Sequence, residues 1–568
     1  MPILTDALEK MEKGNSPFER EIRKFPVPIC KTFLNKKGQI APVVFTAAGE
    51  TLNTKDAAKV RQEFSRTTAK NGNKLLSAKG LNPVPAKGKR VAVLFSGGPA
   101  AGGHNVVAGL KTVLGSKNTL LGVRGGPAGL LAGNFFEITA QDVKRILNTG
   151  GFDFLGSDRT KIKTPEQFAR VKKVCLENKL DALVIVGGDD SNTNAAILAE
   201  YLYAGVQKDG SGIQVIGVPK TIDGDLQVGS LLPISFGFDT ATKIYAELVG
   251  NILQDTPSSR KYWHFIKLMG RAASHVALEV ALQTRPAVTL ISEEIAEQKI
   301  KLQDIIKMLA ETVIQRYQKG LHYGVVVIPE GLIEFIPDIT GLLHMLNEIT
   351  AAHTGELDQM TLAKRREFVA DKLSGEQAVL FKSLPDYIQE MLLLDRDSHG
   401  NLQVSQIPTE RLLIDMTAAY IKEIAPEVKF ATNNHFFGYE GRCGAPSLFD
   451  AAFTFNLGLT AGSLILDNRT GYMAALTALN KGGKILAIPL TGLINVERRH
   501  GKDEMVIEKA LVKTSSKAFK FLAGRRKAWA AADLFTSPGP RQLWGPASHQ
   551  LPVSVALNQG YTKLDFDI

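Results

Sequence analysis

The sequence predicts an α/β protein with two doubly wound, Rossmann-like domains, a helical insertion and an N-terminal extension. Short aliphatic runs, such as residues 182–186, end in glycine-containing loops and precede helix-compatible stretches, which is the repeating unit of an open, largely parallel sheet. Residues 335–425 instead show helical periodicity and lack β-branched strand runs. Because 568 residues exceed one ordinary core, more than one domain is expected.

The composition is that of a soluble globular protein, with 44% hydrophobic and 22% charged residues. No apolar stretch approaches the roughly 18 to 20 residues that span a bilayer, and the N-terminus lacks a signal-peptide pattern, so we expect a cytoplasmic protein without membrane contact. Cys30, Cys175 and Cys443 are far apart and fit neither a zinc site nor a disulfide framework, so buried reduced thiols are expected.

The net charge of +11 raises the possibility of nucleic-acid binding. The basic residues are spread along the chain rather than gathered in one tract, and polyanionic small substrates explain a mild basic excess equally well. We therefore expect no nucleic-acid partner.

The first domain is predicted over residues 88–258, after an N-terminal extension over residues 1–87 that packs on the body and carries no chemistry. Its opening strand runs into a glycine-rich turn. Gly98 and Gly103 have the spacing of a P-loop, but His104 stands where that motif requires Lys, so this is not a Walker A site. The glycines still allow backbone N–H groups to approach a phosphate at a helix N-terminus.

Two acidic loops in this domain each follow a short apolar strand, at residues 187–191 and 219–225. The first carries Asp189 and Asp190, and the second carries further carboxylates beside Lys220. Carboxylates on neighbouring loops repel one another unless a cation or a phosphate-bound metal lies between them, so the pair of loops predicts a site for Mg²⁺ and phosphate. The alternative is that an Asp at a strand end simply caps the following helix.

The second domain is predicted over residues 259–334 and 426–500, on either side of the helical insertion at 335–425. Residues 501–568 are predicted to form a helical segment that packs on the body. Strand-and-loop patterns place Met269-Gly-Arg, Pro329-Glu-Gly and Tyr439-Glu-Gly-Arg at the ends of strands. An ionised Glu330 offers only acceptors to sugar hydroxyls, and the fork of Arg442 suits the oxygens of a phosphate.

These motifs, in this order, resemble the phosphofructokinase family over about residues 88–335 and 426–500. The two acidic loops resemble its pyrophosphate-dependent branch, and the long insertion and Tyr439–Arg442 resemble its long subfamily. The resemblance implies that Gly97 touches the phosphoryl donor and that Arg159 faces the transferred phosphate. It also implies that Asp189 holds Mg²⁺, that Asp223 takes the hydroxyl proton, and that Asp190 and Lys220 belong to the catalytic set.

The resemblance further implies a sugar-phosphate site and a dimer. The implied sugar-phosphate contacts are Thr221, Ile222, Asp223, Asp225, Met269, Gly270, Arg271, Glu330, Tyr439, Glu440, Gly441 and Arg442. Lys261 and Tyr262 match positions that a neighbouring subunit supplies, which implies a homodimer with shared active sites. One departure is that Asn433 stands where ATP-dependent members carry an Arg, nine positions before Arg442.

The implied reaction is reversible transfer of a phosphoryl group from pyrophosphate to the 1-hydroxyl of fructose 6-phosphate, giving fructose 1,6-bisphosphate and phosphate. ATP-dependent relatives have Gly where Asp190 stands. A carboxylate about 4 Å from the α-phosphate would cost on the order of 4 kcal/mol at an effective dielectric near 20. An ATP-dependent kinase and a non-catalytic regulatory subunit remain alternatives. Intact Asp189, Lys220 and Asp223 argue against the latter, and no residue decides a response to fructose 2,6-bisphosphate.

Overall fold

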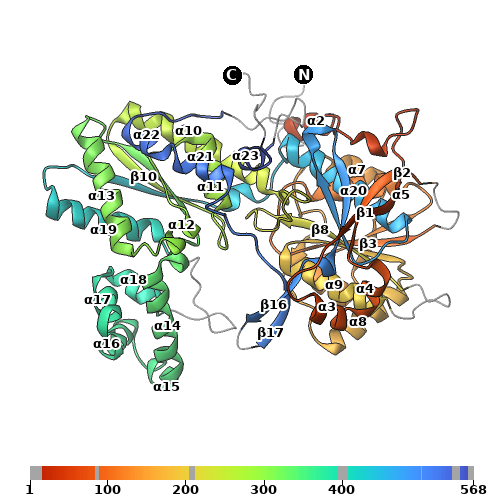
Figure 1. Ribbon diagram of the computed structural model, residues 1–568, viewed down its shortest axis with the longest axis horizontal. Helices are drawn as coiled ribbons and strands as arrows, with labels where there is room; N and C mark the ends of the chain where they lie inside the picture. Colours follow the sequence, from red (N-terminus) through yellow and green to blue (C-terminus); the bar gives the residue numbers. More distant parts are fainter. Residues whose placement is uncertain are drawn as a thin grey trace, which may run out of the picture.

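The computed structural model describes residues 16–82, 88–203, 212–393, 407–499, 502–539 and 551–560. Two sheets form two bodies that lie side by side, and a group of helices stands away below one of them (Figure 1). The larger sheet has 11 strands in the order β1-β2-β15-β14-β8-β7-β3-β4-β5, with β6 beside β3 and β9 beside β8. The predicted α/β class with two sheet domains is therefore confirmed.

The centre of the large sheet is parallel and buried, which explains why its strands appear in the sequence as unbroken aliphatic runs. Every residue of β7 (Ala182–Gly187) and β8 (Gln214–Thr221) is buried. In Figure 1, α5, α7 and α20 lie on one side of this sheet and α3, α4, α8 and α9 on the other. The other strands of this sheet are β1 (Val43–Thr51), β2 (Lys74–Leu81), β3 (Arg90–Ser96), β4 (Thr119–Val123), β5 (Phe135–Glu137), β6 (Ser157–Asp158), β9 (Phe236–Gly237), β14 (Tyr472–Thr477) and β15 (Lys484–Pro489).

Helices cover this sheet and join its strands. They are α2 (Pro17–Ile22), α3 (Ala57–Glu63), α4 (Ser65–Asn71), α5 (Gly103–Leu114), α6 (Gly126–Ala132), α7 (Ala140–Ile146), α8 (Pro165–Glu177), α9 (Asp189–Leu202) and α20 (Leu448–Leu466).

The large sheet includes strands that the sequence led us to place elsewhere. β14 pairs in parallel with β8, and β15 pairs antiparallel with β14, so the assignment of residues 472–489 to the second domain was wrong. β2 pairs with β15, so the N-terminal extension adds strands to this sheet instead of only packing on it. An aliphatic run in the sequence indicates that a strand is buried but not which strands it pairs with, so the sequence could not assign β14, β15 and β2 to the right sheet.

The smaller sheet has four parallel strands in the order β11-β12-β10-β13, with β13 at its edge. Its strands are β10 (Tyr262–Leu268), β11 (Val288–Thr289), β12 (Gly324–Pro329) and β13 (Ala431–Phe437). The helices around it are α10 (Phe238–Ser259), α11 (His275–Thr284), α12 (Ser292–Glu297), α13 (Leu302–Gln318) and α19 (Thr409–Ile424).

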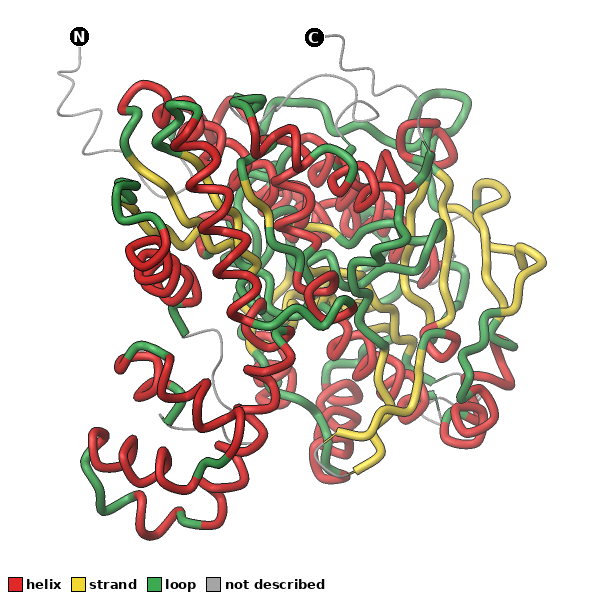
Figure 2. The backbone as a smooth tube through the Cα atoms, turned by 60° about the vertical axis from the view of Figure 1, so that its left-hand side comes forward, coloured by secondary structure: helices red, strands yellow, loops and turns green. Residues whose placement is uncertain are grey.

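The predicted helical insertion is confirmed over its described residues, and Figure 1 and Figure 2 show α14 to α18 projecting from the body while α19 packs against α13 and the smaller sheet. It consists of α14 (Pro337–Ala352), α15 (Thr354–Leu357), α16 (Leu362–Lys372), α17 (Gly375–Ser383), α18 (Asp386–Met391) and α19. Its buried Leu342, Leu346 and Phe381 share one hydrophobic cluster with Val326 and Ile328 of β12. The insertion is therefore anchored through the core of the smaller sheet.

Two expectations about apolar residues need correction. α20 is long and apolar enough to cross a membrane by length and composition, whereas we expected no such stretch. Its apolar window is 100% buried and it packs on α5, so it is a core helix. Cys30 and Cys175 are buried as expected, but Cys443 is exposed.

The C-terminal segment begins as a hairpin and then becomes helical. β16 (Ile494–Arg499) pairs antiparallel with β17 (Lys502–Ile507), so the predicted all-helical segment starts with a strand. The helices that follow are α21 (Lys517–Ala523), α22 (Arg526–Ala531) and α23 (Val553–Asn558). Phe519, Leu522 and Trp529 cluster with Leu278 and Leu282 of α11, which packs this segment on the smaller-sheet domain.

Candidate functional site

The site forms where the carboxyl ends of strands from both sheets face each other. β3 ends at Ser96, and Gly97 follows with φ of +86°, a conformation that glycine adopts without strain. Gly98 lies so close to the guanidinium of Arg442 that a Cβ there would overlap it, and that same Cβ would lie 3.7 Å from Nη2 of Arg159. The glycine pair therefore brings the backbone of the first loop against two arginines from distant parts of the chain.

A lysine completes this cationic group. Lys220, near the end of β8, is buried, and its Nζ lies 3.6 Å from where a Cβ of Gly97 would stand. Burial lowers the pKa of Lys220 to about 8, with Arg442 acting in the same direction and Asp223 opposing it. Nε of Arg442 is buried and has no hydrogen-bond partner among the described residues. Cations that repel one another and an unused donor are the features of a site that awaits an anion.

His104, which replaces the P-loop lysine, has a structural role. Its Nε2 accepts a hydrogen bond from the Phe154 N–H at 3.2 Å, so it orders the loop that carries Phe152. Phe152 in turn stacks on Phe95 with ring centroids 4.1 Å apart, and Lys220 Nζ lies 6.0 Å from the Phe152 ring. His104 and Phe95 thus hold Phe152 in place beside Lys220.

Asp223 lies in the second acidic loop beside the cationic group. Burial raises its pKa to about 6, with Asp225 and Glu330 adding to the rise and Lys509 and Lys220 opposing it. The Asp223 N–H donates to Thr221 Oγ1 at 3.1 Å, which holds the turn. A carboxylate with a pKa near 6 is largely ionised at pH 7 and still basic enough to accept a proton from a hydroxyl group.

The first acidic loop opens α9. Gly188 is its N-cap residue and no side chain caps the helix, so Asp189 and Asp190 are not the caps that the alternative interpretation required. Burial raises the pKa of Asp189, with Lys509 opposing the rise and Asp190 and Asp225 adding to it. Asp190 Oδ2 lies 3.1 Å from Nζ of Lys161, and both side chains are about half exposed (48% and 46%). Asp190 is thus a paired charge at the rim of the site.

The loops of the smaller sheet face these groups. Glu330 follows β12, is buried, and its Oε2 accepts the Gly270 N–H at 2.9 Å. Gly270 has φ of +135°, and a Cβ on Gly331 would overlap the backbone of Arg271, so the two loops pack tightly. One oxygen of the Glu330 carboxylate is thus occupied by a hydrogen bond from the main chain of Gly270.

The loop at residues 438–442 differs from expectation in detail. The Arg442 guanidinium lies at the first loop, against Gly98, whereas the resemblance implies that it contacts the sugar phosphate. Glu440 Oε2 accepts the Gly438 N–H at 2.7 Å, which gives this carboxylate a structural partner. The OH of Tyr245, which the sequence analysis did not select, donates to the Gly438 carbonyl. Tyr439 is 72% exposed at the surface.

Ile222 presents a buried side chain, so only its backbone is available to a ligand.

Lys261 and Tyr262 lie at the opposite end of β10 from Met269. Met269 is seven residue steps from Tyr262 along the strand, which at about 3.3 Å per step places the two roughly 23 Å apart. Lys261 is exposed, and its Nζ lies 5.0 Å from the Tyr262 ring centroid. One chain therefore cannot bring both ends of this strand to a single small ligand.

Two lysines of the site escaped the sequence analysis. Lys161 stands two residues after Arg159, so its proximity to that motif was an available signal. Lys509 Nζ lies 3.7 Å from Oδ2 of Asp225, although the two residues are far apart in sequence. No motif surrounds Lys509.

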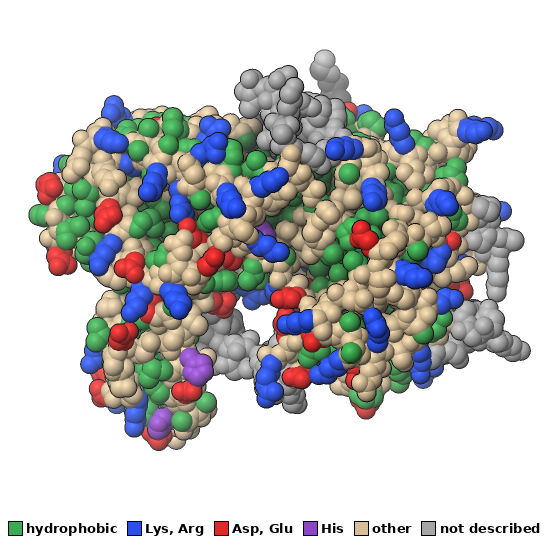
Figure 3. All heavy atoms as spheres, viewed as in Figure 1, with side chains coloured by type: hydrophobic (Ala, Val, Ile, Leu, Met, Phe, Trp, Pro, Cys, Tyr) green, Lys and Arg blue, Asp and Glu red, His purple; other side chains and the backbone are tan. Residues whose placement is uncertain are grey.

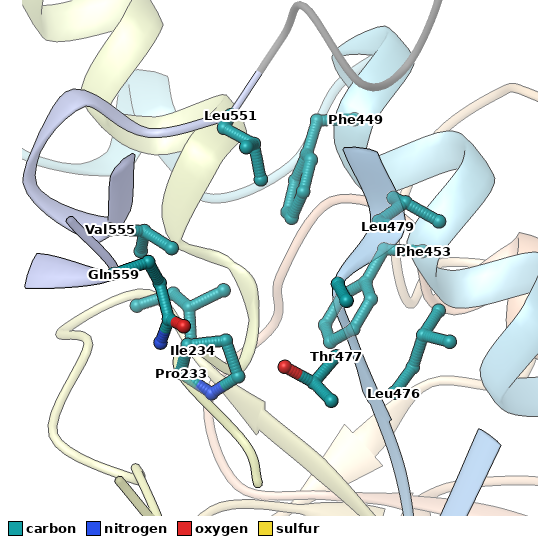
Figure 4. Close-up of a pocket in the computed structure, with 11 residues that line it drawn as sticks. Pro233, Ile234, Phe449, Phe453, Leu476, Thr477, Leu479, Leu551, Val555 and Gln559 are labelled. Carbon is teal, nitrogen blue, oxygen red and sulfur yellow. The ribbon is translucent and has the colours of Figure 1, made fainter. Parts of the chain in front are cut away.

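Other features of the structure do not compete with this site. Figure 4 shows a small pocket between Phe449, Phe453, Leu476 and Val555 that no ionisable side chain lines. Among the described residues, no three His, Cys, Asp or Glu side chains are grouped so that they could hold a metal ion by themselves.

Comparisons with known proteins show the family to which the chain belongs. The Phosphofructokinase family profile matches residues 90–465. The chain is 49% identical to the pyrophosphate–fructose 6-phosphate 1-phosphotransferase of Entamoeba histolytica over 81% of this chain and 84% of that one. It is 45% identical to subunit beta 2 of the Arabidopsis thaliana enzyme of that name, over 81% and 80%. A pyrophosphate-dependent phosphofructokinase from Nitrosospira multiformis shares the fold, with a TM-score of 0.50, 18% identity and coverage of 83% and 96%.

Proposed function

Because the chain belongs to the phosphofructokinase family, we propose that it transfers a phosphoryl group reversibly between pyrophosphate and the 1-hydroxyl of fructose 6-phosphate. The observation that carries the proposal is the meeting of Arg159, Lys220 and Arg442 at Gly97 and Gly98, directly beside the buried carboxylate of Asp223. An anion site next to a carboxylate of raised pKa suits a reaction in which a hydroxyl loses its proton as it attacks a phosphoryl group.

The cations would act by position and charge. Lys220, Arg442 and Arg159 would surround the transferring phosphoryl group, where charge spreads over its oxygens in the transition state. Lys220 is buried, which strengthens its interaction with an anion. We therefore assign Arg442 to the transferred phosphoryl group rather than to the sugar 6-phosphate.

Asp223 would accept the proton of the 1-hydroxyl in the forward direction and return it in the reverse direction. The sugar would lie between Asp223 and the loops that carry Met269, Gly270 and Glu330. The free oxygen of Glu330 can accept a sugar hydroxyl, while its other oxygen is held by the Gly270 N–H.

Mg²⁺ fits the donor side of the site. Asp189 is a mostly desolvated carboxylate whose pKa burial and neighbouring carboxylates raise, so a cation would stabilise its ionised form. Mg²⁺ commonly uses one or two carboxylates together with substrate phosphates, which agrees with the lack of an all-protein metal cluster among the described residues. Bound with pyrophosphate, the ion supplies neutralisation of phosphate charge.

We propose pyrophosphate as the donor because of Asp190, whose carboxylate disfavours ATP through its volume as well as its charge. Because Asp190 is half exposed and paired with Lys161, water and that lysine weaken its repulsion of an α-phosphate. The roughly 4 kcal/mol expected from a bare charge pair is therefore an upper bound. The volume of the Asp190 carboxylate, where ATP-dependent relatives have Gly, supplies the remaining discrimination against ATP.

A homodimer with shared sites is the proposed assembly. Lys261 and Tyr262 lie at the far end of β10 from Met269, and this separation supports a dimer. If all three residues contact the sugar phosphate, Lys261 and Tyr262 must reach the active site of the neighbouring subunit. β13 is the edge of the smaller sheet, next to β10, and Phe436 on it is 39% exposed. An exposed strand edge is a common place for a second chain to bind. A cytoplasmic location remains a prediction.

One assay tests the function. The purified chain is given fructose 6-phosphate with either pyrophosphate or ATP, and fructose 1,6-bisphosphate is followed through coupled aldolase and NADH oxidation. We expect turnover with pyrophosphate and Mg²⁺ and essentially none with ATP, and Asp223→Ser serves as the control for a contaminating activity. ATP turnover by the wild type would favour the ATP-dependent alternative, and no turnover with either donor would favour a regulatory subunit.

A further inference from the structure

The chain between β17 and α21 crosses from one domain to the other at the edge of the site. Where β17 ends, the Ile507 N–H donates to Thr193 Oγ1 of α9 at 2.9 Å, on the helix that opens with Asp189. The Val512 N–H donates to Glu293 Oε1 of α12 at 2.9 Å, in the smaller-sheet domain. Residues 507–512, which we name the crossing segment, are therefore anchored at both ends by different domains.

The middle of the crossing segment is fixed to the second acidic loop. The Ala510 N–H donates to the Asp225 carbonyl at 2.7 Å, and the Ala510 carbonyl lies 2.8 Å from Nε2 of His275 at the start of α11. These two contacts hold the backbone beside Lys509 from both sides. The backbone hydrogen bonds of the neighbouring Ala510 therefore fix the position from which the Lys509 side chain extends.

Lys509 points at carboxylates of the site. Its Nζ lies 3.7 Å from Oδ2 of Asp225, whose side chain is only 4% exposed, while the lysine side chain is 39% exposed. Figure 3 shows acidic and basic side chains gathered over the β16–β17 hairpin, from which the segment departs. The partly exposed Lys509 thus pairs with the buried Asp225 carboxylate and holds it in place.

We propose that Lys509 is a positioning residue of the reaction, which acts through Asp225 to fix the loop that carries Asp223. The proposal rests on the proposed function, in which Asp223 is the base, and on the sugar-phosphate contact of Asp225 that the resemblance implies. Asp225 and Asp223 repel each other across one glycine, and the ammonium group of Lys509, 3.7 Å from Oδ2 of Asp225, offsets that repulsion. Without it, the Asp225 carboxylate would turn toward water and the sugar side of the site would loosen.

The test compares Lys509→Met with Lys509→Arg and with Lys513→Met, an exposed lysine on the same stretch of chain. For Lys509→Met we expect the KM for fructose 6-phosphate to rise roughly three- to tenfold, between the effects of losing an exposed and a buried ion pair, because Asp225 is buried and Lys509 is partly exposed. The KM for pyrophosphate should rise by a smaller factor, because the charge of Lys509 also acts on Asp189. Lys509→Arg keeps the charge and should recover most of the loss. Lys513→Met should match the wild type.

A double-mutant cycle decides whether the effect passes through Asp225. If it does, Lys509→Met adds little to an Asp225→Asn background. Independent, multiplying effects would overturn the proposal, as would wild-type kinetics in Lys509→Met or an equal change of both KM values. Fructose 6-phosphate binding by calorimetry gives the same comparison without turnover. If the wild type binds the sugar phosphate but transfers nothing from pyrophosphate, the proposed function fails while the Lys509 comparison still stands.

Discussion

Two buried groups of opposite function should limit the activity to a narrow range of pH. Asp223 must be ionised to accept a proton, and its pKa is about 6 in the free protein. Lys220 must be protonated to hold a phosphate, and its pKa is about 8. Activity is therefore lost as pH falls through about 6 and again as it rises through about 8. Since kcat/KM reports the free enzyme, we expect it to be highest near pH 7 and about tenfold lower near pH 5 and pH 9.

The perturbation that separates the two limbs is Lys220→Arg. Arginine stays charged throughout this range, so the alkaline limb should disappear while the acid limb stays near pH 6. The measurement is kcat/KM for both substrates from pH 5 to 9.5 at constant ionic strength. Phosphate groups of the substrates also titrate near pH 6, so Asp225→Asn is a needed control. It removes a neighbouring charge that raises the Asp223 pKa and should shift the acid limb downward. An alkaline limb that persists in Lys220→Arg would refute the role of Lys220.

Four further predictions test single groups. Asp223→Ser should lower kcat by about 10²- to 10⁴-fold with fructose 6-phosphate binding nearly unchanged, and near-normal turnover in the coupled assay would remove Asp223 as the base. Asp190→Gly should gain measurable ATP turnover and lose pyrophosphate turnover, whereas a variant that still ignores ATP would show that donor choice lies elsewhere. Mixing inactive Asp223→Ser and Lys261→Ala chains should restore activity in mixed dimers, and mixed dimers that form but stay inactive would place Lys261 in its own chain's site or give it a structural role. Asp450→Ala should lower the free energy of unfolding by about 1 to 3 kcal/mol in denaturant titrations, because it leaves the buried N–H groups of Gly237 and Thr240 without their acceptor, and an unchanged midpoint would contradict this.

The sequence predicted those parts of the fold that local patterns determine. The β7 and β8 strands, the loops after them and the helical insertion all follow from runs of a few residues whose burial sets their composition. The partner of a strand is different, because β14 and β15 have the same aliphatic pattern whichever sheet they join. Their place was decided by α20, which packs on α5 and returns the chain to the larger sheet.

The same limit applied to the site. Asp189, Lys220 and Asp223 could be selected from the sequence because each stands at a strand end within a recognisable loop. The position of the Arg442 guanidinium could not be predicted, because the contact with Gly98 depends on how the two domains close on each other. Lys161 lay beside a motif and could have been selected. Lys509 could not, since its role comes from a backbone path that is fixed by hydrogen bonds to residues of both domains.

The like charges of the site lie closer together than their repulsion favours. Lys220 and Arg442 disfavour each other's charge, and Asp223 and Asp225 do the same, so each like-charged pair is held together only by the fold around it. A bound phosphate relieves the first repulsion, and a cation relieves the second, in part already through Lys509. The energy stored in these repulsions is released when substrates of the matching charge bind. Lys220 lies near the end of a strand, and hydrogen bonds hold the backbone of the loop that carries Asp223 and Asp225, so these groups are in place before the substrates arrive.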